Sequence, residues 1–234
     1  MREAKMIVEE KYPHTYEGNL RIVEAGGQGF DTTIGEDVWR NASTLRQFGE
    51  ATALWLEGNI GHMPTTFFYT HPNEETMPLL PYLNPLNRSG LLVSKFSQPA
   101  RRSTDKVYGE NFGEQRATVG GFIDGSYVEP LLEATKSSQL EVLCSPPGTK
   151  DRLSFIAVSR SNLEDVTYIG NVMSSENIEG SYGGSKRVPG LHSEMVRVLQ
   201  GSHQVDIYDP EWGRNDRLWP MLQRFFTAYS GINI

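Results

Sequence analysis

The chain carries its apolar residues in two rhythms, and each rhythm predicts a different kind of element. Leu79, Leu83 and Leu86 recur at steps of three or four residues, which puts them on one face of a helix. The segment 91–96 that follows is a short, mostly apolar run just before a Ser-Gln-Pro sequence, which is typical of a buried strand. This stretch therefore predicts a helix that packs back on the strand after it.

Read in the same way, the rest of the chain alternates between helical and strand-like segments. Helices are expected over residues 36–57, 75–87, 113–122, 128–138, 191–200 and 218–229. Strands are expected over residues 20–24, 63–70, 91–96, 140–144, 153–159, 166–173 and 204–208. The alternation predicts an α/β fold class, with an N-terminal segment 1–35 followed by one compact domain 36–234 that has a mixed β-sheet core surrounded by helices.

Polar side chains mark the ends of two of these elements. Glu75 and Thr76 open the helix 75–87, where they either cap free amide groups or bind a ligand. Ser94 and Ser97 provide two further hydroxyls near the end of the strand that follows. Since backbone groups are free at such ends, these residues are the first candidates for a binding site.

Two glycine-rich stretches are interpreted as loops. Gly26, Gly27 and Gly29 do not complete the Gly-x-Gly-x-x-Gly pattern of a dinucleotide-binding turn, so a flexible loop is the favoured interpretation. Residues 174–190 are rich in glycine and serine and predict a long loop, the best candidate in the chain for an insertion or a mobile lid.

Composition narrows the class of protein. The chain has 234 residues, a net charge of −7 and a pI of about 5.3, which argues against an extended nucleic-acid surface. The charged N-terminus lacks the apolar core of a secretory signal, and no run of about 18 apolar residues predicts a membrane span. The single cysteine, Cys144, has no partner for an intrachain disulfide, which fits a reducing compartment. A cytoplasmic protein is therefore expected.

Side chains with catalytic chemistry form no recognisable pattern. The five histidines have no metal-ligand spacing with one another or with Cys144, so no metal residue is assigned. The sequence has neither a Gly-x-Ser-x-Gly turn nor a complete Walker loop. His71 is interpreted as a turn residue, and Asp206 and Asp209 as ordinary acidic groups of an acidic protein. No catalytic residue is assigned, although a triad assembled from distant residues stays open.

Four short motifs follow one another along the chain. They are Glu-Thr at 75–76, Asn-Arg-Ser-Gly at 87–90, Ser-Gln-Pro at 97–99 and Gln-Arg-Ala at 115–117. Residues 196–225 then contain a predicted helix, a short strand, an acidic loop and a helix that begins Leu-Trp. In this order and spacing, the chain resembles the C-terminal regulatory domain of eukaryotic methylenetetrahydrofolate reductase over roughly residues 45–228.

The resemblance implies a compact α/β unit that binds S-adenosylmethionine or S-adenosylhomocysteine and performs no chemistry of its own. It implies a ligand site formed by Glu75, Thr76, Ser94, Ser97 and Gln98. A carboxylate can accept hydrogen bonds from two ribose hydroxyls, and small hydroxyls can hold an adenine edge or an amino-acid tail. No catalytic cofactor is expected, and S-adenosylmethionine or S-adenosylhomocysteine would be a ligand.

The chain departs from the family in two ways. One extra residue between Gly90 and Ser97 leaves open whether Val93 or Ser94 takes the place of the family's threonine. The flavin-binding barrel that this domain regulates in the family is not expected within 234 residues.

The predicted function is a stand-alone binding protein for S-adenosylmethionine, S-adenosylhomocysteine or a related adenine nucleotide, which acts as a sensor or by sequestration. Two alternatives stay open. One is an enzyme that cleaves such a ligand in the same pocket, and the other is a protein-interaction module whose pocket has decayed.

Overall fold

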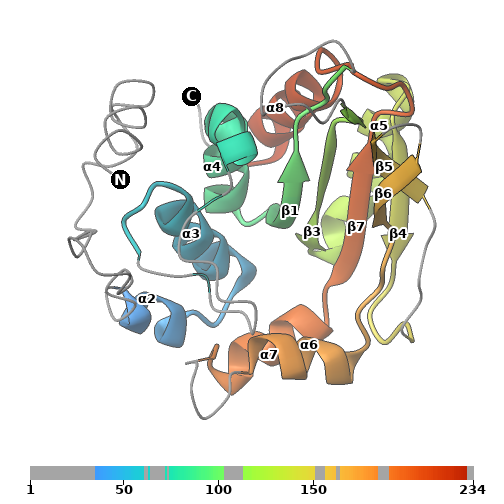
Figure 1. The fold of residues 1–234 in the computed structure, drawn as a ribbon. Coiled ribbons are helices and arrows are strands. Elements are labelled where there is room, and N and C mark those ends of the chain that lie inside the picture. Colours follow the sequence, from blue (N-terminus) through green and yellow to red (C-terminus); the bar gives the residue numbers. More distant parts are fainter. Residues whose placement is uncertain are drawn as a thin grey trace.

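Two antiparallel sheets and the helices around them form the fold (Figure 1). The computed structural model describes residues 35–60, 63, 72, 74–102, 113–150, 156–161, 164–183 and 190–230. The helices are α2 Glu36–Asn41, α3 Leu45–Leu56, α4 Leu80–Ser89, α5 Val128–Ser137, α6 Ser175–Tyr182, α7 Ser193–Gln200 and α8 Leu218–Tyr229, with short 3-10 helices η1 Glu74–Leu79 and η2 Gly125–Tyr127. The strands are β1 Leu92–Gln98, β2 Gly113–Gln115, β3 Thr118–Ile123, β4 Glu141–Ser145, β5 Ile156–Ser161, β6 Glu164–Ile169 and β7 His203–Tyr208.

The strands pair in two separate sheets. The larger sheet has the order β1-β3-β7-β4, and the smaller one has the order β2-β5-β6. The prediction of a single compact α/β domain is confirmed. Every pair of described strands is antiparallel, where a mixed sheet was expected.

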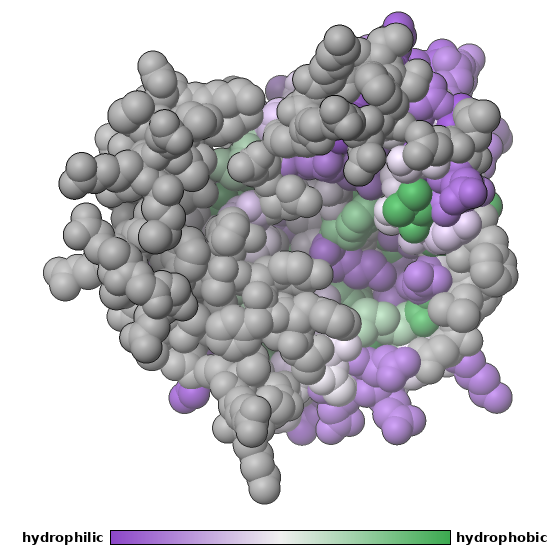
Figure 2. All heavy atoms as spheres, in the orientation of Figure 1, coloured by the Kyte–Doolittle hydropathy of each residue, from purple (hydrophilic) through white to green (hydrophobic). Residues whose placement is uncertain are grey.

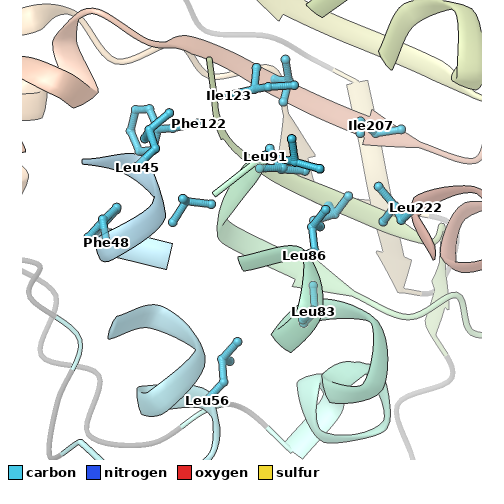
Figure 3. Close-up of a cluster of buried hydrophobic side chains, with 14 of the residues drawn as sticks. Leu45, Phe48, Leu56, Leu83, Leu86, Leu91, Phe122, Ile123, Ile207 and Leu222 are labelled. Atoms are coloured by element: carbon cyan, nitrogen blue, oxygen red, sulfur yellow. The ribbon is translucent and has the colours of Figure 1, made fainter. Parts of the chain in front are cut away.

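The main apolar core lies where the four-stranded sheet meets the helices (Figure 3). In Figure 1, α3 and α4 lie beside β1, and α6 and α7 lie at the lower end of the sheet. Leu83 of α4 and Ile207 of β7 are fully buried in this core. A second, smaller apolar cluster joins Val158, Ile169 and Tyr208, and so links β5 and β6 to the strand β7.

The Asn-Arg-Ser-Gly motif ends α4 as predicted, and its residues hold neighbouring elements together. Gly90 has a left-handed backbone (φ 72°), and a Cβ there would lie 2.5 Å from Arg46 Cα. Arg88 donates to both carboxylate oxygens of Glu57 at 2.6 and 2.7 Å, which ties α4 to α3. The motif therefore has a structural role, because each of these contacts fixes the packing of α3 against α4.

The predicted helix 113–122 is wrong, because this segment forms β2 and most of β3. The sequence Thr-Val-Gly-Gly-Phe-Ile of β3 is buried at every position, in the middle of the larger sheet. Glycine lowers helix propensity, and β3 is buried on both faces, so no alternation of polar and apolar residues marks it as a strand. The tertiary setting overrides the local pattern here.

Three further elements differ from the prediction in extent. The predicted helix 36–57 is broken into α2 and α3, because Thr44 begins a new helix by accepting a hydrogen bond from the Gln47 amide at 3.2 Å. The predicted helix 75–87 starts as the 3-10 turn η1 and continues to Ser89. The predicted loop 174–190 contains α6, which the Ser174 hydroxyl caps.

The other predicted elements are found within a few residues of their expected bounds. The predicted strand 20–24, nearly all of 63–70, the loop with Gly26, Gly27 and Gly29, and His71 lie outside the described residues. Within the described part of the chain, no helix has both the length and the apolar character needed to cross a membrane.

Candidate functional site

Glu75 lies where η1 meets the end of β1. Its carboxylate accepts a hydrogen bond from Arg101 Nη2 at 2.7 Å and another from Gln115 Nε2 at 3.2 Å. The Arg101 and Gln115 backbones also bond to each other, which continues the pairing of strands past β1. The Glu75 side chain remains 22% exposed. The carboxylate is therefore fixed in position on a side chain that is partly exposed.

Thr76 is buried next to Glu75 in the same turn. Gln98 is buried at the end of β1, and its Nε2 donates to the carbonyls of Arg116 (3.1 Å) and Val158 (2.9 Å). Gln98 therefore joins the two sheets. Glu75 and Gln98 both lie near the end of β1, but the amide donors of Gln98 are already used.

Ser94 lies on the helix side of β1, away from Gln98. Its amide donates to Asn87 Oδ1 at 2.8 Å, and its hydroxyl accepts from Asn87 Nδ2 at 2.9 Å. These bonds connect the end of α4 to β1 inside the core. Ser94 is therefore engaged structurally and is not brought together with Glu75.

A β-bulge lies between Ser94 and Phe96, where the strand has its extra residue. Ser94 pairs with Gly121, whereas Phe96 pairs with Gly120, so Lys95 and Phe96 together oppose one residue. The bulge puts Ser94 and Ser97 on the same face of β1. In a regular strand a residue three places before Ser97 would lie on the opposite face. Because of the bulge, Val93, which pairs with Phe122, is the residue on the face opposite Ser97, and Ser94 is not. Val93 therefore takes the position in the strand that the family's threonine would occupy.

Arginines crowd the end of the sheet beyond Glu75. The guanidinium carbons of Arg116 and Arg160 lie 4.3 and 4.4 Å from the centroid of the Trp212 ring. Arg160 also donates to Glu114 at 2.6 Å. Gln115 Oε1 and Arg116 Nε are buried and have no hydrogen-bond partner in the part of the chain that the structure describes. This end of the molecule is thus polar, preorganised and not fully satisfied.

Lys95 and Asp206 are two charged residues whose importance the sequence did not indicate. Asp206 is only 7% exposed and lies on β7 opposite Gly120, which pairs on its other side with Phe96, the residue after Lys95. Burial lowers the pKa of Lys95, and the nearby Asp206 opposes that shift. Burial also raises the pKa of Asp206, against the charge of Lys95 and a hydrogen bond from the Gly170 amide. For both groups, loss of water outweighs their mutual attraction.

These two charges lie beside strands that are themselves buried, with Lys95 partly exposed and Asp206 almost completely buried. Figure 2 shows hydrophobic and hydrophilic residues side by side where the middle of the molecule is visible between the grey atoms. Among the described residues, no group of three potential metal ligands gathers. The arrangement is suited to holding a small polar molecule through fixed charges and amides.

Two features of the sequence bear on Lys95 and Asp206, but neither feature by itself places the two residues near each other. The extra residue in the strand 91–98 indicated a bulge, and the Gly-Gly pair at 120–121 indicated close approach of a side chain. Only the pairing of β1, β3 and β7 joins these signals at one point.

Comparisons with known proteins identify a family. A search of curated proteins finds no match to the chain. The family model described as "Domain of unknown function (DUF6919)" matches residues 35–229, which is most of the chain. The protein therefore belongs to the DUF6919 family.

Proposed function

We propose that this protein binds S-adenosylmethionine, S-adenosylhomocysteine or a related adenine nucleotide without changing it, and acts as a sensor or by sequestration. The observation that carries the proposal is the Glu75 carboxylate, which Arg101 and Gln115 hold in place at 2.7 and 3.2 Å while it stays partly exposed. A fixed carboxylate can accept hydrogen bonds from the two hydroxyls of a ribose without first losing side-chain entropy.

The neighbouring amide supports the same ligand class. Gln115 Nε2 donates to Glu75, which fixes the orientation of the amide and leaves Oε1 as a buried acceptor with no donor among the described residues. An unmet buried acceptor costs free energy, so Gln115 holds Glu75 at some cost to stability. Gln115 therefore acts by positioning the Glu75 carboxylate, which is the acceptor that we propose a donor-rich ligand uses.

The proposal uses Glu75, Thr76, Ser97 and Gln98 unequally. Glu75 would make the principal contact, Thr76 and Ser97 would make lesser ones, and Gln98 would support the wall because its amide spans both sheets. Ser94 would act only through β1, since Asn87 holds its amide and hydroxyl. The single thiol of Cys144 suits the reducing cytoplasm, where we propose that the protein works.

A thermal-shift screen tests this function. The melting temperature of the purified protein is measured with S-adenosylmethionine, S-adenosylhomocysteine and adenine mono-, di-, tri- and cyclic nucleotides. Each ligand is then recovered, and its mass is measured to show whether it has been converted. A ligand at about a thousandfold over its Kd adds roughly 4 kcal/mol to the free energy of unfolding. For a domain of this size the melting temperature should rise by about 10 °C.

The matched variants are Glu75→Ala and, as a control, Glu194→Ala on the exposed surface of α7. Glu75→Ala should remove the shift and leave the unliganded protein folded, while Glu194→Ala should keep the shift. A converted ligand would make the protein an enzyme instead. If no adenine compound shifts the melting temperature, the proposed function is wrong and a protein-interaction role becomes the better account.

A further inference from the structure

Lys95 is a lysine placed by a bulge rather than by the regular pleat of its strand. It lies between Ser94 and Phe96, where the register of β1 against β3 shifts. Its Nζ lies 6.0 Å from the centroid of the Phe122 ring. Within the described residues, Nζ makes no hydrogen bond and no ion pair within 4 Å, yet it is not sealed from solvent. Bulges often re-aim side chains next to binding sites, and this one aims an ammonium over β3.

Asp206 faces the same place from the other side of β3. Its Oδ2 accepts a hydrogen bond from the Gly170 amide at 2.8 Å, which fixes the carboxylate. Its Oδ1 would lie 2.0 Å from a Cβ built on Gly120, so the carboxylate leans over a position that only glycine can occupy without displacement. Oδ1 accepts no hydrogen bond from the described residues and is not among the sealed polar atoms.

The two charges attract each other but do not close into an ion pair. A buried ion pair recovers its cost of desolvation only when its geometry is close and its remaining hydrogen bonds are satisfied. Here Lys95 Nζ and Asp206 Oδ1 have no direct partner among the described residues. Burial lowers the pKa of Lys95 and raises the pKa of Asp206, so it favours the neutral form of each group. An apolar pair would serve stability better at this place. The separation of the charges therefore calls for an occupant.

The occupant must present opposite charges to two fixed groups. It needs an anionic acceptor for the three donors of Lys95 and a cationic donor for the free oxygen of Asp206. A phosphate would satisfy Lys95 but would meet the negative charge of Asp206. A neutral polyol would form hydrogen bonds but would leave both charges without compensation. A zwitterion fits both ends and adds no net charge.

We propose that Lys95 and Asp206 bind the head of an α-amino acid, with its carboxylate at Lys95 and its ammonium at Asp206. This inference deepens the proposed function and rests on it for the nucleoside half of the ligand. It selects S-adenosylmethionine and S-adenosylhomocysteine over adenine nucleotides, because only the former carry an amino-acid tail. Lys95 lies three residues before Gln98, roughly 10 Å along the strand, a span that a nucleoside with such a tail can cover.

The surroundings suit the chain that joins the two halves of such a ligand. Phe122, below Lys95, contacts Tyr182 with ring centroids 5.8 Å apart. Aromatic rings of this kind accommodate methylene groups and sulfur, which the tail carries between its charged head and the ribose. The Gln204 amide bonds to the Met173 backbone at 3.0 and 2.6 Å and holds the segment after β6 against β7.

Calorimetric titration with paired ligands tests the inference. S-adenosylhomocysteine and 5′-methylthioadenosine share the nucleoside and the sulfur, but only the first has the amino-acid head. We expect the wild-type protein to bind S-adenosylhomocysteine at least about tenfold more tightly, because only this ligand has an amino-acid head that can form charge-assisted hydrogen bonds with Lys95 and Asp206. Lys95→Met and Asp206→Asn should each remove that preference and keep the affinity for 5′-methylthioadenosine within about twofold.

The control variant is Lys136→Met, which removes an exposed lysine from α5 and should leave both affinities unchanged. Melting curves show whether the variants fold, and the near-isosteric Asp206→Asn keeps the test decisive if Lys95→Met does not. Equal wild-type affinities for the two ligands, or equal losses for both ligands in the variants, would overturn the inference and leave the nucleoside function standing.

A titration with free methionine distinguishes failure of the nucleoside function from failure of the amino-acid site. If neither nucleoside binds, free methionine is titrated into the wild-type protein and into Lys95→Met. Binding by the wild type alone would retain the amino-acid site and remove the nucleoside. Absence of methionine binding as well would overturn both proposals.

Discussion

Asp206 and Asp209 are three residues apart in the sequence, and both are almost completely buried, yet their surroundings differ. Asp209 accepts hydrogen bonds from Arg214 Nε at 2.7 Å and from the Glu211 amide at 2.9 Å, and Arg214 Nη2 makes a further bond to it. Asp206 accepts one amide bond, and its nearest cation, Lys95, does not reach ion-pair distance. Asp209 is therefore enclosed in a hydrogen-bonded network, whereas Asp206 is open, in the sense that one of its carboxylate oxygens accepts no hydrogen bond from the described residues.

The difference separates a structural charge from a charge that is available to a ligand. The Asp209 network raises the pKa of Arg214, chiefly through the hydrogen bond to Asp209, and its contacts fix the loop after β7. Lys95 and Asp206 lack the further hydrogen bonds or the ion pair that would compensate for their loss of water. A satisfied network stabilises the fold, whereas an open pair of opposite charges costs stability until something occupies it.

Breaking the closed network should have the largest effect. Arg214→Met leaves Asp209 buried without its cation and should lower the free energy of unfolding by about 3–5 kcal/mol. Urea denaturation followed by circular dichroism measures the loss. Arg197→Met, which removes an exposed arginine from α7, should change stability by less than about 0.5 kcal/mol. Similar values for the two variants would show that the Asp209 network does not stabilise the fold.

Filling the space above β3 should have the next largest effect. Gly120→Ala brings a methyl group onto Asp206 Oδ1 and should cost about 1–3 kcal/mol. Asp206→Ala in the same protein removes the obstructing carboxylate, so the double variant should recover part of that loss. In contrast, Gly180→Ala meets no atom within 4 Å in α6 and should be neutral or stabilising. Strict additivity of the two substitutions would contradict the close contact.

Neutralising the open acid should have a small effect on stability. Asp206→Asn keeps an oxygen for the Gly170 amide and removes a carboxylate that burial already disfavours. We expect the free energy of unfolding to change by no more than about 1 kcal/mol, whereas Asp209→Asn should lose about 3 kcal/mol. The two variants are compared in one denaturation series, and a reversed order would remove the distinction between the open and closed sites.

The smallest effect is a dependence of stability on alkaline pH that Lys95 introduces. Its pKa is lowered in the folded protein, mainly by burial, so between that lowered pKa and 10.5 the unfolded chain binds more protons than the folded one. Stability contributed by this group therefore rises with pH across that window. Denaturation from neutral pH to about pH 10.5 should show the wild type gaining relative to Lys95→Met. A constant difference would mean that Lys95 is not desolvated.

The sequence predicted the elements whose signals are local. Gly90 was expected to end its helix and does so, and the helix 218–229 matches α8 in both bounds. The segment 113–122 was assigned to a helix because apolar and glycine residues in a central strand follow no period of two. Whether a buried run is helix or strand depends on what packs on each face, and that information lies in other parts of the chain.

The candidate site was predicted in part for the same reason. Glu75, Thr76 and the end of β1 lie together because the helix between them folds back, a consequence of its apolar face. Ser94 and Ser97 could not be assigned to faces, because one bulged residue reverses the alternation beyond it. Asp206 was indistinguishable from the other acids of an acidic chain until β7 paired with β3.

The sequence by itself determined where most helices and strands begin and end, the α/β class, and the small residues that permit close contacts. The tertiary structure alone decided which charges are closed by a partner and which remain open. The physical reason is range: capping, propensity and periodicity act within a few residues, whereas desolvation and ion pairing depend on groups brought together from distant strands, as Lys95, Gly120 and Asp206 are.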